Sequence, residues 1–196
     1  MSALRLLRFL APLVLAAAAT AAEVVHEFRL DAVAFGTNAA LVAPRFDPAL
    51  GVLRRVEFEL STRVQGLAGF ENLGPGPAIA DVSLQSAARV SLPDASVSCV
   101  AAHRADAQFA LAGFDGQRDW AGSSGRLLPA EVTAFGASVV ESGLAAYIAN
   151  GRSNELLLPI HLRGGFQLRG EAECALRESW NVQVVVRLRY VYEPAS

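Results

Sequence analysis

The chain has 196 residues, enough for one domain, and it carries 17 basic and 19 acidic side chains for a formal net charge of −2. All the basic side chains are arginines and they form no cluster, so the composition argues against binding to a nucleic-acid backbone. Apolar residues make up 53%, which excludes a disordered chain, and one methionine and two cysteines exclude a methionine-rich groove or a cysteine-rich zinc scaffold.

Residues 1–22 have the composition of a secretory signal peptide. Two arginines precede an apolar run from Phe9 to Ala19, and small residues follow, which predicts cleavage after Ala21 or Ala22. A membrane anchor is the alternative, but the run is shorter than the roughly 20 apolar residues that cross a bilayer. We therefore expect export and removal of this segment.

The remaining residues, 23–196, are expected to form a single domain that is secreted or periplasmic. They contain no second apolar stretch of spanning length, so we expect no integral membrane segment. No hydrophobic tail or basic stop follows Pro194, and the sequence therefore predicts no C-terminal anchor.

Polar and apolar residues alternate over much of the chain, and a period of two is typical of β-strands. The pattern is clear in 56–65, in 82–92 and in 181–192, where every second residue is apolar or small. Weaker strand candidates are, in chain order, 24–35, 96–102, 107–114, 132–140, 155–163 and 166–175.

Turn signals separate these segments. Asp47-Pro48 favours a type I turn, and Gly51 can take a positive φ after it. Residues 115–129 form a long polar connection, and Gly164-Gly165 predicts a hairpin between the candidates on either side. One short helix is expected at 142–149.

Many short strands with turns about every ten residues predict an all-β fold. The expected architecture is an antiparallel two-sheet β-sandwich, jelly-roll-like, with at most one short helix. Alternation argues against a parallel sheet, whose strands are covered on both faces and read as continuous apolar runs. A closed barrel has the same periodicity and remains the alternative.

Two cysteines, Cys99 and Cys174, are present in a chain that we expect to be exported. An oxidising compartment favours a disulfide between them, and loop closure would contribute at most roughly 4–5 kcal/mol. The alternatives are two buried free thiols or a metal site, for which His103 is the only nearby histidine. We predict the disulfide.

Several segments, taken in order, resemble the bacterial choice-of-anchor E domain family over residues 24–193. They are Phe46 to Leu53, Glu71-Asn72-Leu73, Phe114-Asp115-Gly116, Asp119 to Gly125, Leu144 to Ile148 followed by Gly151, and Tyr190-Val191-Tyr192. The resemblance implies an exported or surface-attached β-domain without an assigned activity or ligand. The missing sorting motif after Pro194 favours a released or periplasmic protein.

No catalytic constellation is found, and we predict neither catalytic residues nor a required cofactor. His26, His103 and His161 lack metal-ligand spacing, and no nucleophile elbow, phosphate loop or dinucleotide fingerprint occurs. Glu57 and Glu59 share a strand face, but beside arginines they are expected to act as cross-strand charge partners.

The loop that carries Asp115, Asp119 and Trp120 is the candidate ligand site. The two carboxylates offer oxygen ligands to Ca²⁺, although the spacing is not that of an EF-hand, and Trp120 can stack on a sugar ring. The structural alternative is a loop closed by aspartate capping with Trp120 tucked beneath it.

These observations favour a secreted, non-enzymatic β-sandwich that acts by surface contact in the extracellular matrix or cell envelope. The second hypothesis is a carbohydrate-binding module that uses Asp115–Pro129 and Trp120, and the third is a hydrolase with an unrecognised site. The partner is unknown, with polysaccharide or envelope components as candidates and nucleic acid excluded.

Overall fold

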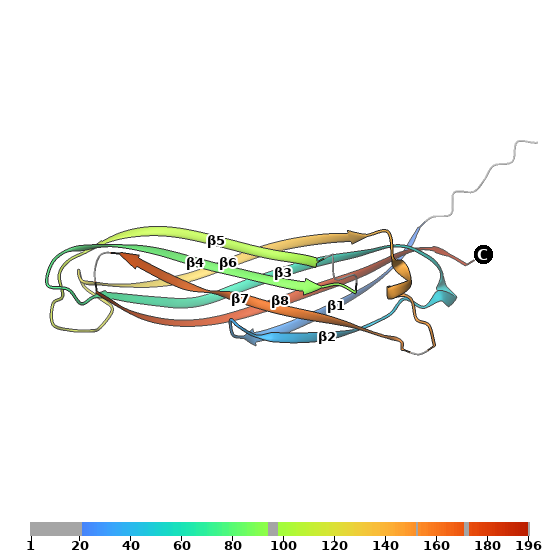
Figure 1. The fold of residues 1–196 in the computed structure, drawn as a ribbon, viewed down its shortest axis with the longest axis horizontal. Coiled ribbons are helices and arrows are strands. Elements are labelled where there is room, and N and C mark those ends of the chain that lie inside the picture. Colours follow the sequence, from blue (N-terminus) through green and yellow to red (C-terminus); the bar gives the residue numbers. More distant parts are fainter. Residues whose placement is uncertain (1–20, 94–97, 152, 171–172, 196) are drawn as a thin grey trace, which may run out of the picture.

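The computed structural model describes residues 21–93, 98–151, 153–170 and 173–195. Almost all of the predicted signal peptide lies outside these residues. The described part is an elongated two-sheet sandwich whose strands follow its long axis (Figure 1). No helix in the described ranges is long and apolar enough to cross a membrane.

Within the described residues the domain consists of eight strands and two short 3₁₀ turns. They are β1 (Ala22–Val33), β2 (Asn38–Pro44), η1 (Pro48–Leu50), β3 (Gly51–Asn72), β4 (Ala78–Ser91), β5 (Ser98–Leu111), β6 (Gly125–Val140), η2 (Leu144–Tyr147), β7 (Glu155–Gly170) and β8 (Cys174–Pro194). The predicted helix at 142–149 is thus one 3₁₀ turn, because so short a segment gains too few backbone hydrogen bonds to propagate.

The strands form two antiparallel sheets in the orders β1-β8-β3-β6 and β2-β7-β4-β5. β1 pairs with β8, β2 with β7, β3 with β6 and β4 with β5, as when one long hairpin is rolled up on itself. This is the connectivity of an eight-stranded jelly roll. The all-β sandwich is therefore confirmed. The alternative of a closed barrel is wrong, since no ladder of backbone hydrogen bonds joins β5 to β6 or β1 to β2 in the described residues.

Alternation along the strands places one face of each sheet in the core. Every second residue of 56–64 in β3 is buried, and so is every second residue of 182–190 in β8. In register, Phe58 lies opposite Leu188 and Leu60 opposite Val186. Full burial of each such side chain stabilises the fold by about 1.5–3 kcal/mol. The predicted strands at 56–65, 82–92 and 181–192 are confirmed.

Two of the predicted strand breaks are wrong. The candidates 96–102 and 107–114 belong to the single strand β5, and β7 runs straight through Gly164-Gly165 instead of turning there. At Gly164 a Cβ atom would lie 2.4 Å from the Gln85 carbonyl oxygen. The glycine therefore serves a close approach of backbones and not a hairpin.

The turn at Asp47-Pro48 is confirmed. Asp47 Oδ1 accepts a hydrogen bond from the Ala49 amide at 2.9 Å, and the chain then enters β3 through Gly51 at φ 144°. η1, η2 and the C-terminus lie at one end of the sandwich, and the loop between β5 and β6 lies at the other (Figure 1).

The predicted disulfide is wrong: both cysteines are free. Cys99 is buried on β5, where its Sγ donates to the Phe58 carbonyl oxygen at 3.9 Å, whereas Cys174 begins β8 opposite Asn72. Positions 58 and 72 lie on the same strand, so the sulfurs are separated by about 45 Å at roughly 3.3 Å per residue. A disulfide requires Cα atoms within about 7 Å.

Candidate functional site

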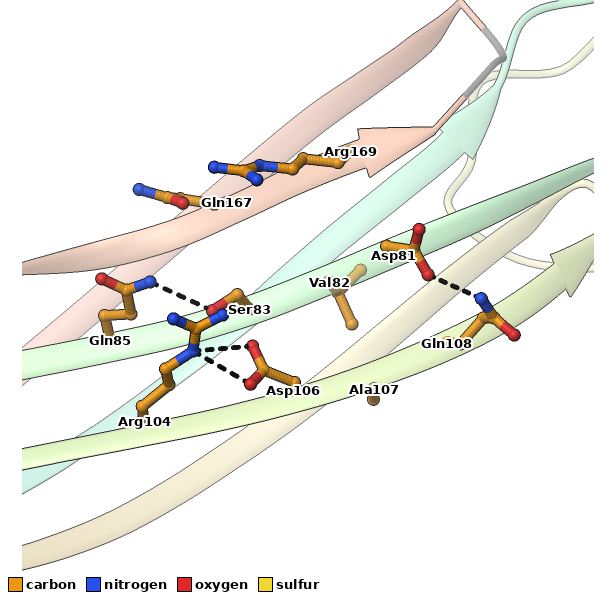
Figure 2. Close-up of a pocket in the computed structure, with 10 residues that line it drawn as sticks. All are labelled: Asp81, Val82, Ser83, Gln85, Arg104, Asp106, Ala107, Gln108, Gln167 and Arg169. Atoms are coloured by element: carbon orange, nitrogen blue, oxygen red, sulfur yellow. Dashed lines mark hydrogen bonds and ion pairs between the residues drawn. The ribbon is translucent and has the colours of Figure 1, made fainter.

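A shallow hollow of about 660 Å³ lies on the outer face of the sheet β2-β7-β4-β5 (Figure 2). It crosses β4, β5 and β7, and we call it the polar groove. The polar side chains that line it are Asp81, Ser83, Gln85, Arg104, Asp106, Gln108, Gln167 and Arg169.

Strand register gathers these side chains into rows across the sheet. Asp81 lies between Gln108 and Arg169, Ser83 lies between Asp106 and Gln167, and Gln85 lies beside Arg104. Neighbours in such a row have Cβ atoms about 4.5–5.5 Å apart, close enough to contact one ligand together. On its other side Gln85 lies opposite Gly165 of β7, which has no side chain, so the groove stays open there.

Hydrogen bonds hold the floor of the groove in place (Figure 2). Arg104 Nε donates to both carboxylate oxygens of Asp106 at 2.9 and 3.1 Å, and Gln108 Nε2 donates to Asp81 Oδ1 at 2.7 Å. Arg104 and the Ser83 hydroxyl hold the pKa of the Asp106 carboxyl below its ordinary value. Asp106 therefore stays a charged acceptor in weakly acidic solution.

Gln167 and Arg169 extend from β7 without a hydrogen-bond partner among the described residues (Figure 2). Their amide and guanidinium groups are exposed and available to a ligand. The two carboxylates and two guanidinium groups of the polar groove carry no net charge together. The surface thus offers both donors and acceptors without attracting ions of either sign.

The polar groove continues toward one end of the sheet. A second hollow of about 570 Å³ shares Asp81 and Gln108 with it and then passes between Ile79, Ala110 and Gly170. The side chains there are small or apolar. The combined surface is long and open, a shape suited to an extended polymer, whereas a small molecule is usually bound in a concave pocket that covers most of it.

The predicted ligand loop follows β5, and its carboxylates accept hydrogen bonds from its own backbone. Asp115 Oδ1 accepts from the Gln117 amide at 2.8 Å, and Asp119 Oδ1 accepts from the Ala121 amide at 2.9 Å. No group of three or more potential metal-ligating side chains occurs within the described ranges. The connection is also shorter than expected, because β6 begins at Gly125.

Trp120 is half-buried in this loop. Its amide donates to Glu71 Oε2 at 2.7 Å, and its side chain lies 3.3 Å from the position of a Cβ on Gly69. The residue has a positive φ of 61°, which is uncommon for a bulky side chain. Trp120 thus covers the end of β3, as in the structural alternative considered for this loop.

Asn72, fully buried at the end of β3, ties two loops together, the one between β3 and β4 and the one between β5 and β6. Its Nδ2 donates to the carbonyl oxygens of Gly76 at 2.8 Å and Ala112 at 2.7 Å, and its Oδ1 accepts from the Gly74 amide at 2.9 Å. Asn72 therefore orders both loops through hydrogen bonds to their backbones.

Glu57 and Glu59 each form an ion pair with an arginine of β8, and Glu57 also pairs with Arg55 on its own strand. Glu57 contacts Arg55 at 2.6 Å and Arg189 at 3.5 Å, and Glu59 contacts Arg187 at 3.4 Å. The interpretation as charge partners is confirmed. The three histidines lie on three different strands, β1, β5 and β7.

Sequence reasoning missed the polar groove. Its residues looked like the ordinary wet faces of three strands, and only the register of β4 with β5 and β7 brings them together. The one available signal was the unusual share of amides and carboxylates on the polar side of β4 and β5, at Asp81, Gln85, Asp106 and Gln108.

Comparison with protein families and with curated proteins finds no match. Among solved structures, the chain aligns with infectious bursal disease virus of the Gx strain at 11% identity and a TM-score of 0.18, covering 90% of this chain and 38% of the viral chain. A VP2 subviral particle of the same virus aligns at 10% identity and a TM-score of 0.15, covering 90% and 42%. The chain therefore spans about two fifths of those chains, and scores this low carry no argument about function.

Proposed function

We propose that this protein is an exported, non-enzymatic binding domain that acts by surface contact, and that its polar groove binds a polysaccharide of the extracellular matrix or cell envelope. The observation that carries the proposal is the composition of the groove: donors and acceptors in rows, with no net charge, on a long open surface. Export rests on residues 1–22, and the resemblance to the choice-of-anchor E family supports a role outside the cell.

The chemistry of sugars matches this surface. Each sugar hydroxyl both donates and accepts hydrogen bonds, and neighbouring hydroxyls suit the planar groups of Asp, Gln and Arg. Gln167 and Arg169 have no competing partner among the described residues, so binding breaks no hydrogen bond of theirs. A neutral groove also avoids the salt-dependent attraction that a highly charged polymer requires.

The same geometry argues for binding rather than hydrolysis. Glycosidases place two carboxyl groups on opposite sides of the scissile bond, and one of them has a raised pKa so that it can act as an acid. In the groove, Asp81 and Asp106 both lie on one floor, and the pKa of Asp106 is lowered.

Affinity electrophoresis in native gels that contain dextran, xylan, hydroxyethyl cellulose or alginate tests the proposal. At least one polymer should retard the protein, and the double variant Gln167→Ala/Arg169→Ala should lose about tenfold in affinity or more, the effect of about 1.4 kcal/mol. Arg163→Ala is the matched control, since Arg163 is exposed on β7 outside the groove.

Two outcomes would overturn the proposal. One is that none of the four polymers retards the protein. The other is retardation that survives the double variant but is lost in Trp120→Ala with an unchanged melting temperature. That result would move the sugar site to the loop between β5 and β6.

A further inference from the structure

Another hollow, of about 550 Å³, lies on the outer face of the other sheet, β1-β8-β3-β6. Phe135 on the edge strand β6 forms one wall, and we call this the Phe135 hollow. Glu27, Glu59 and Arg187 line the other side, with Ser61 and Val185 between them. It is similar in size to the polar groove and faces away from it, because the two sheets pack through their inner faces.

Phe135 has the most exposed large hydrophobic side chain in the described residues, at 77%. In register it lies opposite Ser61, which in turn lies opposite Val185. These neighbours are shorter than phenylalanine, so the ring stands above the floor of the hollow. An aromatic ring in this position offers a flat apolar surface to a molecule that lies on the sheet.

The polar side of the Phe135 hollow is fixed by ion pairs. Arg187 contacts Glu27 Oε2 at 3.1 Å and Glu59 Oε2 at 3.4 Å, from the strand that lies between them. Hydrogen bonds from Arg29 and Arg187 hold the pKa of Glu27 below its ordinary value, so its acceptor oxygens stay ionised. Charged donors and acceptors thus line one row, beside an apolar ring in the next.

We propose that the Phe135 hollow is a second sugar subsite, and that the protein joins two polysaccharide chains. This rests on the proposed function of the polar groove. A sugar ring has an apolar face of C–H bonds, which would pack on Phe135, and hydroxyls at its edge, which would bond to Glu59 and Arg187. The two sites open in opposite directions across sheets about 10 Å apart, so two different stretches of polymer occupy them.

Light scattering measures the joining of chains directly. Wild-type protein, added to whichever of dextran, xylan, hydroxyethyl cellulose or alginate retards it in native gels, should raise the scattered intensity. Phe135→Ala should abolish the increase while leaving the polymer bound, because the polar groove is intact. The Gln167→Ala/Arg169→Ala variant should also abolish it. Val139→Ala is the control, since Val139 is exposed on the same strand.

Calorimetry with hexasaccharides of the same polymer separates the two proposals. Wild type should bind two hexasaccharides per chain, and Phe135→Ala should bind one. If Phe135→Ala still binds two and scatters like wild type, the second subsite is wrong and the groove stands. Absence of binding by wild type overturns both proposals. Self-association without polymer that is lost in Phe135→Ala would make this face a contact between copies and refute the subsite.

Discussion

Asn72→Ala should destabilise the protein far more than a typical substitution. The side chain is fully buried, and its removal leaves two carbonyl oxygens and one amide, those of Gly76, Ala112 and Gly74, without their partner. Each buried polar group left unsatisfied costs about 1–3 kcal/mol. Because turns at the end of the sandwich readmit some water, we expect a total loss of about 3–5 kcal/mol, a large part of a typical stability of about 5–15 kcal/mol.

Urea denaturation followed by circular dichroism measures this loss. Asn38→Ala is the control, because Asn38 is an exposed asparagine whose side chain is hydrogen-bonded to the exposed His161, and we expect a change within about 0.5 kcal/mol. Asn72→Asp should be at least as harmful as Asn72→Ala, since a carboxylate cannot donate to the two carbonyls. A loss below about 1 kcal/mol for Asn72→Ala would refute the hydrogen-bond reasoning.

Three further outcomes are expected. Tyr190→Phe should cost about 1–3 kcal/mol in the same urea assay, because the buried Tyr190 hydroxyl donates to a β2 carbonyl oxygen at 2.8 Å; an unchanged midpoint would contradict this. A thiol reagent should label Cys174 but not Cys99 in the folded protein, and it should label both after unfolding without reductant. If neither cysteine is labelled after unfolding, the two are joined by a disulfide and the assignment of free thiols is wrong. Arginine hydrogen bonds lower the pKa of Glu27 and Glu131 from 4.5. Their contribution to stability is therefore complete above about pH 4.5 and lost as the pH falls through the folded-state pKa values, so the melting temperature should fall on acidification from pH 6 to 3; a flat profile would argue against it.

The two central strands of one sheet could be predicted because their environment is uniform. In β3 and β8, one face meets the core and the other meets water over a long stretch, so each residue type reports its side. The edge strand β5 gives a weaker signal. Its inward-facing Ala105 and Ala107 are small and remain exposed beside an apolar opening between the sheets. The alternation of polar and apolar residues is therefore weak there, and the sequence predicted a break between two strands.

Local and distant features differed in how far the sequence could predict them. The turn at Asp47 depends on residues close in the chain, and it was expected. The separation of Cys99 from Cys174 and the assembly of the polar groove depend on strand register, which one sequence does not specify. The prediction of an oxidising compartment rests on residues 1–22, and it does not tell at which end of the sandwich each thiol lies.

The place of β8 in its sheet governs how the chain can fold. β8 lies between β1 and β3, and in the described residues β1 pairs with no other strand. The first ladder of β1 therefore forms only after a loop of nearly the whole chain has closed, and contacts of such high sequence separation slow folding. In the export proposed above, with the N-terminus leading, β1 and one edge of β3 would stay unpaired until the last segment arrives, and this unfolded intermediate would be the stage most prone to aggregation.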